Sequence, residues 1–294
     1  MTEKPFTGCG TALLTPFKED LSIDYDAYAM LVERQVNGGV SFLTPLGTSG
    51  ETPTLSKAEK RELLKITYAH AQGLPLLVGV GSNSIPYTLE NMELVKDLAD
   101  AFLVVVPFYN KPTQEGMYLY YKELARNSSR PIIMYNVPGR TGVNMTAETT
   151  LRIVREVDGI IGIKEASGNI EQVKTIISGV HDNFTILSGD DDLTFDIISH
   201  GGDGVVSVAS NILPRQVSDM VRYASTEKKA ESKELNDKLM PLFKACFVEP
   251  NPIPGKAALS LLGLCSDEVR LPLTKANSHT RALIKSVLQE WKLI

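Results

Sequence analysis

The chain has 294 residues, of which 43% are hydrophobic and 22% charged, as is ordinary for a globular protein. Its formal net charge of −5 argues against a nucleic-acid binder. No apolar stretch reaches the length of a membrane span, and Met1–Pro5 lacks the basic segment and apolar core of a signal peptide. The three cysteines, Cys9, Cys246 and Cys265, are too sparse for a disulfide framework, so reduced thiols and a cytoplasmic location are expected.

Eight short apolar segments alternate with amphipathic helical segments up to about residue 224. Many of them are rich in Val, Ile and Leu throughout, which is typical of parallel strands covered on both faces. Eight strand–helix units favour a closed (β/α)8 TIM barrel over an open doubly wound sheet, and no G-x-G-x-x-G follows the first strand. The predicted strands are Cys9–Leu14, Val40–Leu46, Leu76–Val80, Phe102–Val106, Ile132–Asn136, Ile160–Lys164, Thr185–Ser188 and Gly204–Val208.

The helices are marked by caps and by apolar residues at helical spacing. Ser56 followed by Glu59 predicts a capping box, and further helices are expected to begin near Gln114 and after Thr146. The alternation with strands ends near Tyr223. We therefore predict a barrel domain of residues 1–224 and a helical appendage of residues 225–294 that packs on it, containing the helices Glu227–Cys246, Lys256–Leu264 and Lys275–Trp291.

Lys164 closes a predicted buried strand and is the most informative residue of the chain. Desolvation disfavours the protonated form of a buried amine, and a neutral lysine attacks carbonyl carbons and forms Schiff bases. Gly162, on the same strand face, is expected to leave room beside the lysine stem. The alternative is a structural lysine paired with Glu165 or another acid, which the residue type alone favours.

Other reactive side chains lie at predicted strand exits, where TIM barrels place their active sites. Thr48 and Ser49 follow the second strand, and their hydroxyls can grip a carboxylate or relay a proton. Tyr109 follows the fourth strand. Tyr135, at the fifth, can act as a general acid or base, and Arg140 behind it offers a planar fork for a carboxylate. Each segment alone also fits a structural turn, a packed aromatic or a surface ion pair.

Three acids, Asp190, Asp191 and Asp192, follow the seventh strand. They are interpreted as caps of a helix N-terminus rather than as metal ligands, because the four histidines are scattered along the chain. The hydroxyl pair, the two tyrosines, the arginine and the lysine together suit imine chemistry on a small keto acid. The hydroxyls would hold the carboxylate, the lysine the keto carbon and a tyrosine the protons.

Five motifs resemble the dihydrodipicolinate synthase family, in order and over nearly the whole chain. They are Gly47–Glu51, Tyr109–Gly116, Tyr135–Gly142, Ile161–Ala166 and Glu249–Pro254. The wider superfamily of pyruvate-imine enzymes includes N-acetylneuraminate lyase and keto-deoxy sugar acid aldolases. An arginine within the string Tyr-Asn-x-Pro-x-Arg-Thr-Gly favours the synthase family.

The resemblance implies that Lys164 forms an imine with pyruvate and that the derived enamine attacks L-aspartate 4-semialdehyde. The product would be 4-hydroxy-tetrahydrodipicolinate, for lysine and diaminopimelate biosynthesis. Tyr135 would shuttle protons through Thr48 and Tyr109. In this family the residue matching Tyr109 enters the neighbouring subunit's site, which implies a homotetramer arranged as a dimer of dimers. No metal and no organic cofactor are implied.

The resemblance also implies the substrate-binding groups. Ser49, with Thr48, would bind the pyruvate carboxylate, and Arg140 the carboxylate of the semialdehyde. Gly189 and Val206 would line the lysine pocket through their backbone groups. Ser49 and Val206 stand where many relatives carry threonine and isoleucine; the hydroxyl is retained, so little change is expected.

The feedback site of lysine-inhibited family members is matched only in part. Asn83 fits their pattern. Lys57 and Lys60 stand where some of them carry histidines, Tyr87 where an acid is expected and Phe108 where a tyrosine is expected. The lost acid and the two added cations should repel the ammonium group of an amino acid. Weak or absent inhibition by L-lysine is therefore expected.

Two other functions are open from the residues. A sister aldolase or dehydratase would use the same imine on a sugar-derived keto acid, against which Arg140 and the Tyr109 segment argue. A non-catalytic barrel would serve as an oligomeric binding or scaffolding protein, but it would be expected to have lost part of the lysine, tyrosine and threonine set. Neither a nucleic acid nor a membrane is expected as a partner.

Overall fold

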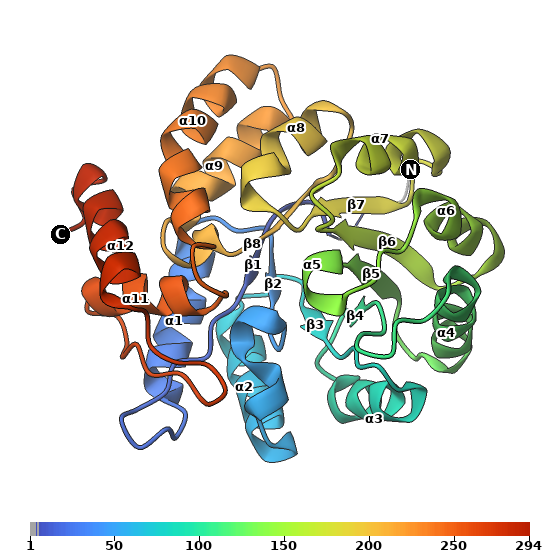
Figure 1. Ribbon diagram of the computed structural model, residues 1–294, viewed down its shortest axis with the longest axis horizontal. Coiled ribbons are helices and arrows are strands. Elements are labelled where there is room, and N and C mark those ends of the chain that lie inside the picture. Colours follow the sequence, from blue (N-terminus) through green and yellow to red (C-terminus); the bar gives the residue numbers. More distant parts are fainter. Residues whose placement is uncertain (1–3, 5) are drawn as a thin grey trace.

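The computed structural model describes residue 4 and residues 6–294, so most of the Met1–Pro5 stretch, where no signal peptide was expected, lies outside the described residues. Eight parallel strands form a barrel with helices around it (Figure 1). All eight predicted strands are confirmed, with ends that shift by no more than two residues. They are β1 Gly8–Ala12, β2 Phe42–Thr44, β3 Leu77–Gly79, β4 Ala101–Val105, β5 Ile132–Asn136, β6 Ile160–Glu165, β7 Thr185–Ser188 and β8 Gly204–Ser207.

The strand order β2-β1-β8-β7-β6-β5-β4-β3 leaves β2 and β3 at its two ends. A parallel bridge between Leu43 and Leu76 joins these two ends. The Leu43 N–H also donates to Pro75 O at 3.0 Å, and Gly79 N–H to Pro45 O at 3.0 Å. The barrel therefore closes, which confirms the predicted TIM barrel and brings the carboxyl ends of all eight strands to one rim.

The helices of the barrel follow the predicted signals. The capping box of Ser56 and Glu59 is present, α4 begins at Gln114, and Thr146 caps α6. The short helix α5 lies in the loop after β5. The elements are α1 Tyr25–Asn37, α2 Lys57–His70, α3 Ile85–Val95, α4 Gln114–Asn127, α5 Pro138–Thr141, α6 Ala147–Glu156, α7 Ile170–Gly179, α8 Thr194–Ser199 and α9 Pro214–Ala224, with 3-10 turns η1 Thr48–Gly50, η2 Thr52–Thr54, η3 Asp191–Leu193 and η4 Ala209–Asn211.

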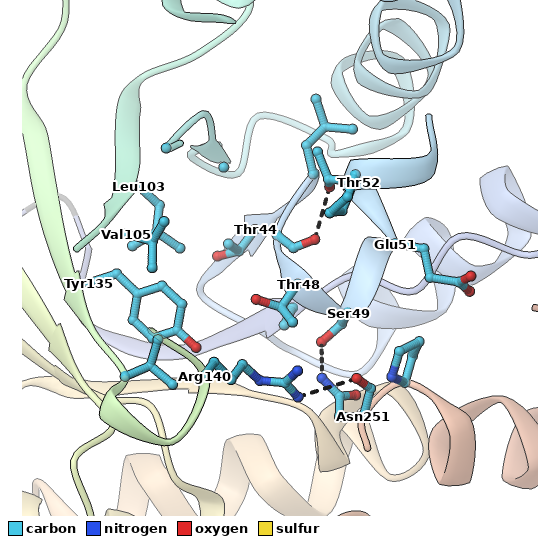
Figure 2. Close-up of a pocket in the computed structure, with 18 of the residues that line it drawn as sticks. Thr44, Thr48, Ser49, Glu51, Thr52, Leu103, Val105, Tyr135, Arg140 and Asn251 are labelled. Carbon is cyan, nitrogen blue, oxygen red and sulfur yellow. Dashed lines mark hydrogen bonds between the residues drawn. The ribbon is translucent and has the colours of Figure 1, made fainter. Parts of the chain in front are cut away.

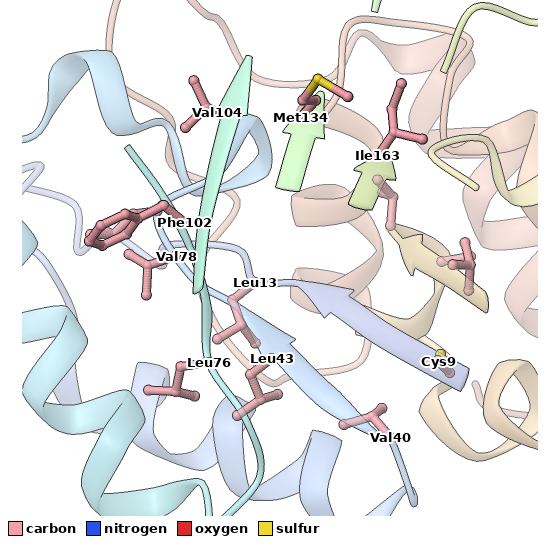
Figure 3. Close-up of a cluster of buried hydrophobic side chains, with 14 of the residues drawn as sticks. Cys9, Leu13, Val40, Leu43, Leu76, Val78, Phe102, Val104, Met134 and Ile163 are labelled. Carbon is pink, nitrogen blue, oxygen red and sulfur yellow. The ribbon is translucent and has the colours of Figure 1, made fainter. Parts of the chain in front are cut away.

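Side chains of the strands alternate between two apolar layers. Phe102 and Val104 of β4 belong to the large cluster between the strands and the helices (Figure 3), whereas Leu103 belongs to the cluster inside the barrel. In β6 the same alternation places Ile163 in the outer layer and therefore Lys164 on the inner face. The packed interior thus forms the base on which polar side chains at the rim are held.

Three helices follow the barrel, and no further strand occurs in the described part of this segment. They are α10 Lys229–Ala245, α11 Ile253–Leu261 and α12 Ser278–Glu290. Helix α10 packs on α9, and α12 packs on both α10 and α11 (Figure 1). The predicted start of the middle helix at Lys256 was wrong. Helix α11 begins at Ile253, because a proline such as Pro254 is tolerated in a first turn, where N–H groups have no helical partner.

Within residues 4 and 6–294, no helix is both long and apolar enough to cross a membrane. The three cysteines are free thiols, and Cys9 and Cys246 are buried.

Candidate active site

A cavity of about 580 Å³ opens at the carboxyl rim of the barrel. Its wall includes six of the eight residues that the sequence singled out, namely Thr48, Ser49, Tyr135, Arg140, Lys164 and Gly189. Figure 2 shows the side chains of Tyr135, Thr48 and Arg140 around the same space, although they come from separate loops of the chain. The barrel therefore brings most of the predicted site together.

Lys164 and Tyr135 lie side by side in the wall of this cavity. They are paired residues of the adjacent strands β5 and β6, and the Lys164 Nζ lies 4.2 Å from the centroid of the Tyr135 ring. Lys164 is 6% exposed and Tyr135 is 8% exposed. A hydroxyl that can move protons thus stands next to a shielded amine.

The structural alternative, an ion pair between Lys164 and Glu165, is wrong. Successive residues of a strand point to opposite faces, so Glu165 turns away from the barrel interior. Its carboxylate accepts hydrogen bonds from Asn136 Nδ2 at 3.0 Å and Gln172 Nε2 at 2.9 Å. Burial raises the pKa of Glu165, and these hydrogen bonds oppose the shift. In the described part of the chain, no salt bridge joins Lys164 to a carboxylate.

Room for the lysine stem comes from Gly189 and not from Gly162. A Cβ added at Gly162 would meet the carbonyl oxygen of Thr185 at 2.7 Å, so that glycine serves the close approach of β6 to β7. A Cβ at Gly189 would lie 3.0 Å from Lys164 Cε and 2.6 Å from the Cβ of Ala166. The prediction about Gly162 chose the correct strand face but the wrong neighbour.

Thr48 and Ser49 form the 3-10 turn η1 after β2. Ser49 is 2% exposed, and its Oγ accepts a hydrogen bond from Asn251 Nδ2 at 2.9 Å (Figure 2). Because Asn251 occupies an acceptor position of this hydroxyl, the Ser49 proton remains available to a ligand. The arrangement suits a carboxylate, which can only accept hydrogen bonds.

Arg140 lies in α5 and reaches across the cavity toward the C-terminal segment. Its guanidinium donates to the backbone carbonyl of Asn251 at 3.2 Å, and the side chain is otherwise exposed (Figure 2). A guanidinium carries five N–H donors, so several remain for a bound anion. Asn251 thus contacts two of the three side chains predicted to bind carboxylates, Ser49 and Arg140.

The other two predicted residues do not line the cavity. Tyr109 is 88% exposed and has a φ of 75°, in the left-handed region that tyrosine rarely adopts. Val206 is fully buried within β8, in the cluster inside the barrel, and Val208 lines the cavity in its place. The suggested roles of Tyr109 and Val206 remain predictions.

Among the residues of the cavity wall that sequence reasoning missed, Asn251 and Thr44 carry buried polar atoms without a partner in the part of the chain that the structure describes. Asn251 Oδ1 and Thr44 Oγ1 are buried and have no hydrogen-bond partner among the described residues. Such atoms are expected to bind a ligand or water, because an unpaired buried polar group is costly. Asn251 lies inside the motif Glu249–Pro254, which was noted only for its resemblance to the family; Thr44 is an ordinary strand residue and gave no signal.

With this geometry the chain can be compared with known proteins. Residues 5–291 match the sequence profile of the Dihydrodipicolinate synthetase family. The chain belongs to this family. It is 46% identical over 294 residues to the 4-hydroxy-tetrahydrodipicolinate synthase of Thermotoga neapolitana, a match that covers 98% of this chain and 100% of the relative.

Solved structures of the family share the fold in detail. The dihydrodipicolinate synthase of Thermotoga maritima superposes with a TM-score of 0.96 at 43% identity, covering 99% of this chain and 100% of that one. A structure described as the first monomeric dihydrodipicolinate synthase variant also has a TM-score of 0.96 at 43% identity and covers 98% of both chains. The barrel with its C-terminal helices is therefore the family architecture.

The acids after β7 have a more specific arrangement than the predicted helix caps. Asp191 is buried, and its Oδ2 accepts hydrogen bonds from the N–H groups of Val208 at 2.9 Å and Ala209 at 3.0 Å. It therefore caps the turn after β8 and not the turn η3, in which it lies itself. Asp190 lines the cavity. Burial and then the neighbouring Asp192 raise the pKa of Asp190 to about 6, and the Lys164 ammonium opposes this shift. Over the described range, no group of His, Cys, Asp and Glu is arranged to hold a metal ion.

Replacing Asp190 by asparagine is expected to stabilise the fold at neutral pH. A folded-state pKa of about 6, against an ordinary 3.8, means that the folded protein binds more protons than the unfolded chain between these values. Stability therefore falls as pH rises through this window and stays lower above it. The free energy of unfolding of Asp190→Asn should exceed that of the wild type by up to about 3 kcal/mol at pH 7, with a smaller difference where solvent screens the charge. Below pH 4 the two proteins should be equally stable. Urea unfolding from pH 4 to 8 measures this, with the exposed Asp196→Asn as control; an equal gain at every pH would contradict it.

Proposed function

We propose that this chain condenses pyruvate with L-aspartate 4-semialdehyde to give 4-hydroxy-tetrahydrodipicolinate, a lyase-type reaction of lysine and diaminopimelate biosynthesis. The observation that carries the proposal is the shielded amine of Lys164 beside Tyr135, in a cavity walled by carboxylate-binding groups. Membership of the family, with 46% identity to a synthase of this name over the full length, supports the substrates. A shared barrel alone would not.

The reaction begins at Lys164. Its neutral amine adds to the keto carbon of pyruvate, and loss of water leaves a protonated imine. Removal of a proton from the pyruvate methyl group then gives an enamine, which is a carbon nucleophile. The narrow space beside Gly189 would hold the lysine stem in one orientation during these steps.

The enamine attacks the aldehyde carbon of the semialdehyde, which forms the new carbon–carbon bond and regenerates the imine. The amino group of the adduct then adds to the imine carbon and displaces the Lys164 amine. This exchange closes the six-membered ring and frees the enzyme. No electrons are exchanged with an outside donor, so the chain's own acid–base groups suffice.

Tyr135 is proposed to carry protons in both halves of the reaction. Its ring lies beside Lys164 Nζ, where the imine would form, and Thr48 lies on the same cavity wall. Tyr109 would connect this relay to solvent from a neighbouring subunit. The exposure of Tyr109 and its left-handed backbone support a role outside its own cavity, because strained residues cluster at functional sites.

The two carboxylates would be held separately. Thr48 and Ser49 would bind that of pyruvate, the Ser49 hydroxyl donating while Asn251 bonds to its oxygen. The Arg140 guanidinium would bind that of the semialdehyde. We also propose that residues 225–294 act as an appendage that completes the wall of the barrel unit, residues 1–224, and that the protein works as a dimer of dimers.

Lys164→Met should abolish imine formation. With the wild type, borohydride added in the presence of pyruvate is expected to leave a pyruvyl mass on the peptide that contains Lys164. The Met variant should show none, and kcat should fall by about a thousandfold or more. The surface variant Lys65→Met serves as control. Labelling at another residue, or normal turnover by the Met variant, would refute the mechanism; faster turnover with sugar aldehydes than with the semialdehyde would refute the substrate.

The neighbouring-subunit role of Tyr109 predicts complementation. Lys164→Met and Tyr109→Phe should each be nearly inactive alone, but a mixed dimer contains one site with both an intact Lys164 and a donated Tyr109. Random assembly should therefore restore about a quarter of wild-type activity. Co-expressing Lys164→Met with Tyr135→Phe is the matched control, because both residues belong to one cavity and no site is complete. Activity no greater in the first mixture than in the control would contradict the role.

Inhibition by L-lysine is proposed to be weak or absent. Lys57 forms an ion pair with Glu90, and the basic residue Lys60 lines the cavity in place of a histidine. Burial and then the neighbouring Lys57 lower the pKa of Lys60, and a cation at this position would repel a bound ammonium group. Initial rates at saturating substrates should change little with millimolar L-lysine. Tyr87→Glu, which adds an acid, should increase sensitivity. Strong, saturable inhibition of the wild type by L-lysine would contradict the proposal.

A further inference from the structure

The turn that carries Thr48 and Ser49 ends on a buried ion pair. Glu51 follows η1, and its Oε1 lies 2.5 Å from the Nζ of Lys256 in α11. Both side chains are only 1% exposed. Two residues far apart in the sequence thus tie the cavity rim to the C-terminal segment through charges that water does not reach.

Each member of this pair has further partners that fix its direction. Lys256 Nζ donates to the carbonyl oxygen of Glu268 at 2.7 Å and lies 4.0 Å from the centroid of the Phe17 ring. Glu51 Oε2 accepts from the backbone N–H of Arg270 at 2.9 Å. Burial lowers the pKa of Lys256, and the Glu51 carboxylate opposes this shift. Lys256 is thus held by Glu268 and Phe17, and the Glu51 carboxylate by the backbone of Arg270 in addition to the ion pair.

These contacts hold the backbone of Glu51 in an unusual conformation. Its φ of 53° lies in the left-handed region, which a glutamate adopts rarely. This conformation turns the chain between η1 and η2, so that Thr48 and Ser49 line the cavity while the Glu51 side chain points away from Tyr135 (Figure 2). Thr15, which lies after β1, donates a hydrogen bond from its Oγ1 to the carbonyl oxygen of Gly50, the residue before Glu51, at 2.8 Å. The turn is thus fixed on both sides of Glu51.

A buried ion pair is a poor means of gaining stability alone, because apolar side chains of similar size often serve as well or better. Its value lies in selecting one conformation of the groups attached to it. Here the attached group is the turn that offers two hydroxyls to a ligand. Preorganised donors bind better than mobile ones, since no ordering is needed on binding.

We infer that the Glu51–Lys256 ion pair positions Thr48 and Ser49 for the carboxylate of the keto acid. The inference rests on the proposed function and deepens it, because it makes a lysine of the C-terminal segment a positioning residue of the pyruvate subsite. The hydrogen bond from Asn251 to Ser49 Oγ comes from the same segment and acts on the same turn. The cavity wall and the C-terminal helices are then one functional unit.

The test measures pyruvate binding apart from turnover. Borohydride trapping on Lys164 is titrated with pyruvate for the wild type, Lys256→Met and the double variant Glu51→Gln/Lys256→Met. The double variant leaves no buried charge unpaired, so it should melt closer to the wild type than the single variant does. In both, half-saturating pyruvate should rise about tenfold or more, and the KM for pyruvate should rise more than the KM for the aldehyde.

Lys4→Met is the matched control, since it removes the ion pair with Asp203, which lies near the amino ends of the strands. It should lower the melting temperature and leave half-saturating pyruvate unchanged. If Lys256→Met or the double variant is folded and traps pyruvate with wild-type half-saturation, the inference is overturned while the proposed function stays intact. Failure of the wild type to trap pyruvate at all would instead overturn the proposed function.

Discussion

The structure depends on holding one amine in a shielded position without a carboxylate against it. The parallel pairing of β5 and β6 sets Lys164 beside Tyr135 on the inner face of the barrel, and strand alternation sends Glu165 to the opposite face. An amine paired with a carboxylate would stay protonated and would not attack a ketone. Strand alternation therefore separates Lys164 from the carboxylate of Glu165, its neighbour in the sequence, which is what the proposed role of Lys164 requires.

A second set of constraints comes from outside the barrel strands. Asn251 and Lys256, both from the C-terminal segment, fix Ser49, the Arg140 guanidinium and Glu51 from one side of the cavity. The strands can place residues at a common rim, but loops need further contacts to take one conformation. The C-terminal segment therefore contributes to the cavity rim together with the strands of the barrel.

The sequence was sufficient to predict those features of the fold and the site that depend on a local pattern of residues. Apolar segments predicted all eight strands, and Lys164 and Tyr135 followed from their places at strand ends. It failed where a feature depends on contacts between distant segments. Gly162 packs against β7, whereas Gly189 packs against the side chain of Lys164, and the sequence alone does not show these neighbours. Asn251 gained a role only because folding brings it into hydrogen-bonding contact with Ser49. The role proposed for Tyr109 involves a second subunit and stays a prediction, since this side chain is exposed and does not line the cavity of its own subunit.

Charged groups that are costly to bury gather at the carboxyl rim. Burial raises the pKa of Asp190, Asp191 and Glu165. Glu165 is the last residue of β6, and Asp190 and Asp191 follow β7. Asp191 and Glu165 are each bonded to groups that define a loop, whereas Asp190 lies on the cavity wall itself. Groups with shifted pKa values concentrate at functional sites. Such sites use ionisable groups in buried positions, where folding by itself would favour apolar side chains. The rim is therefore the part of the barrel where stability is given up for chemistry, and the apolar layers below it supply the stability that makes this possible.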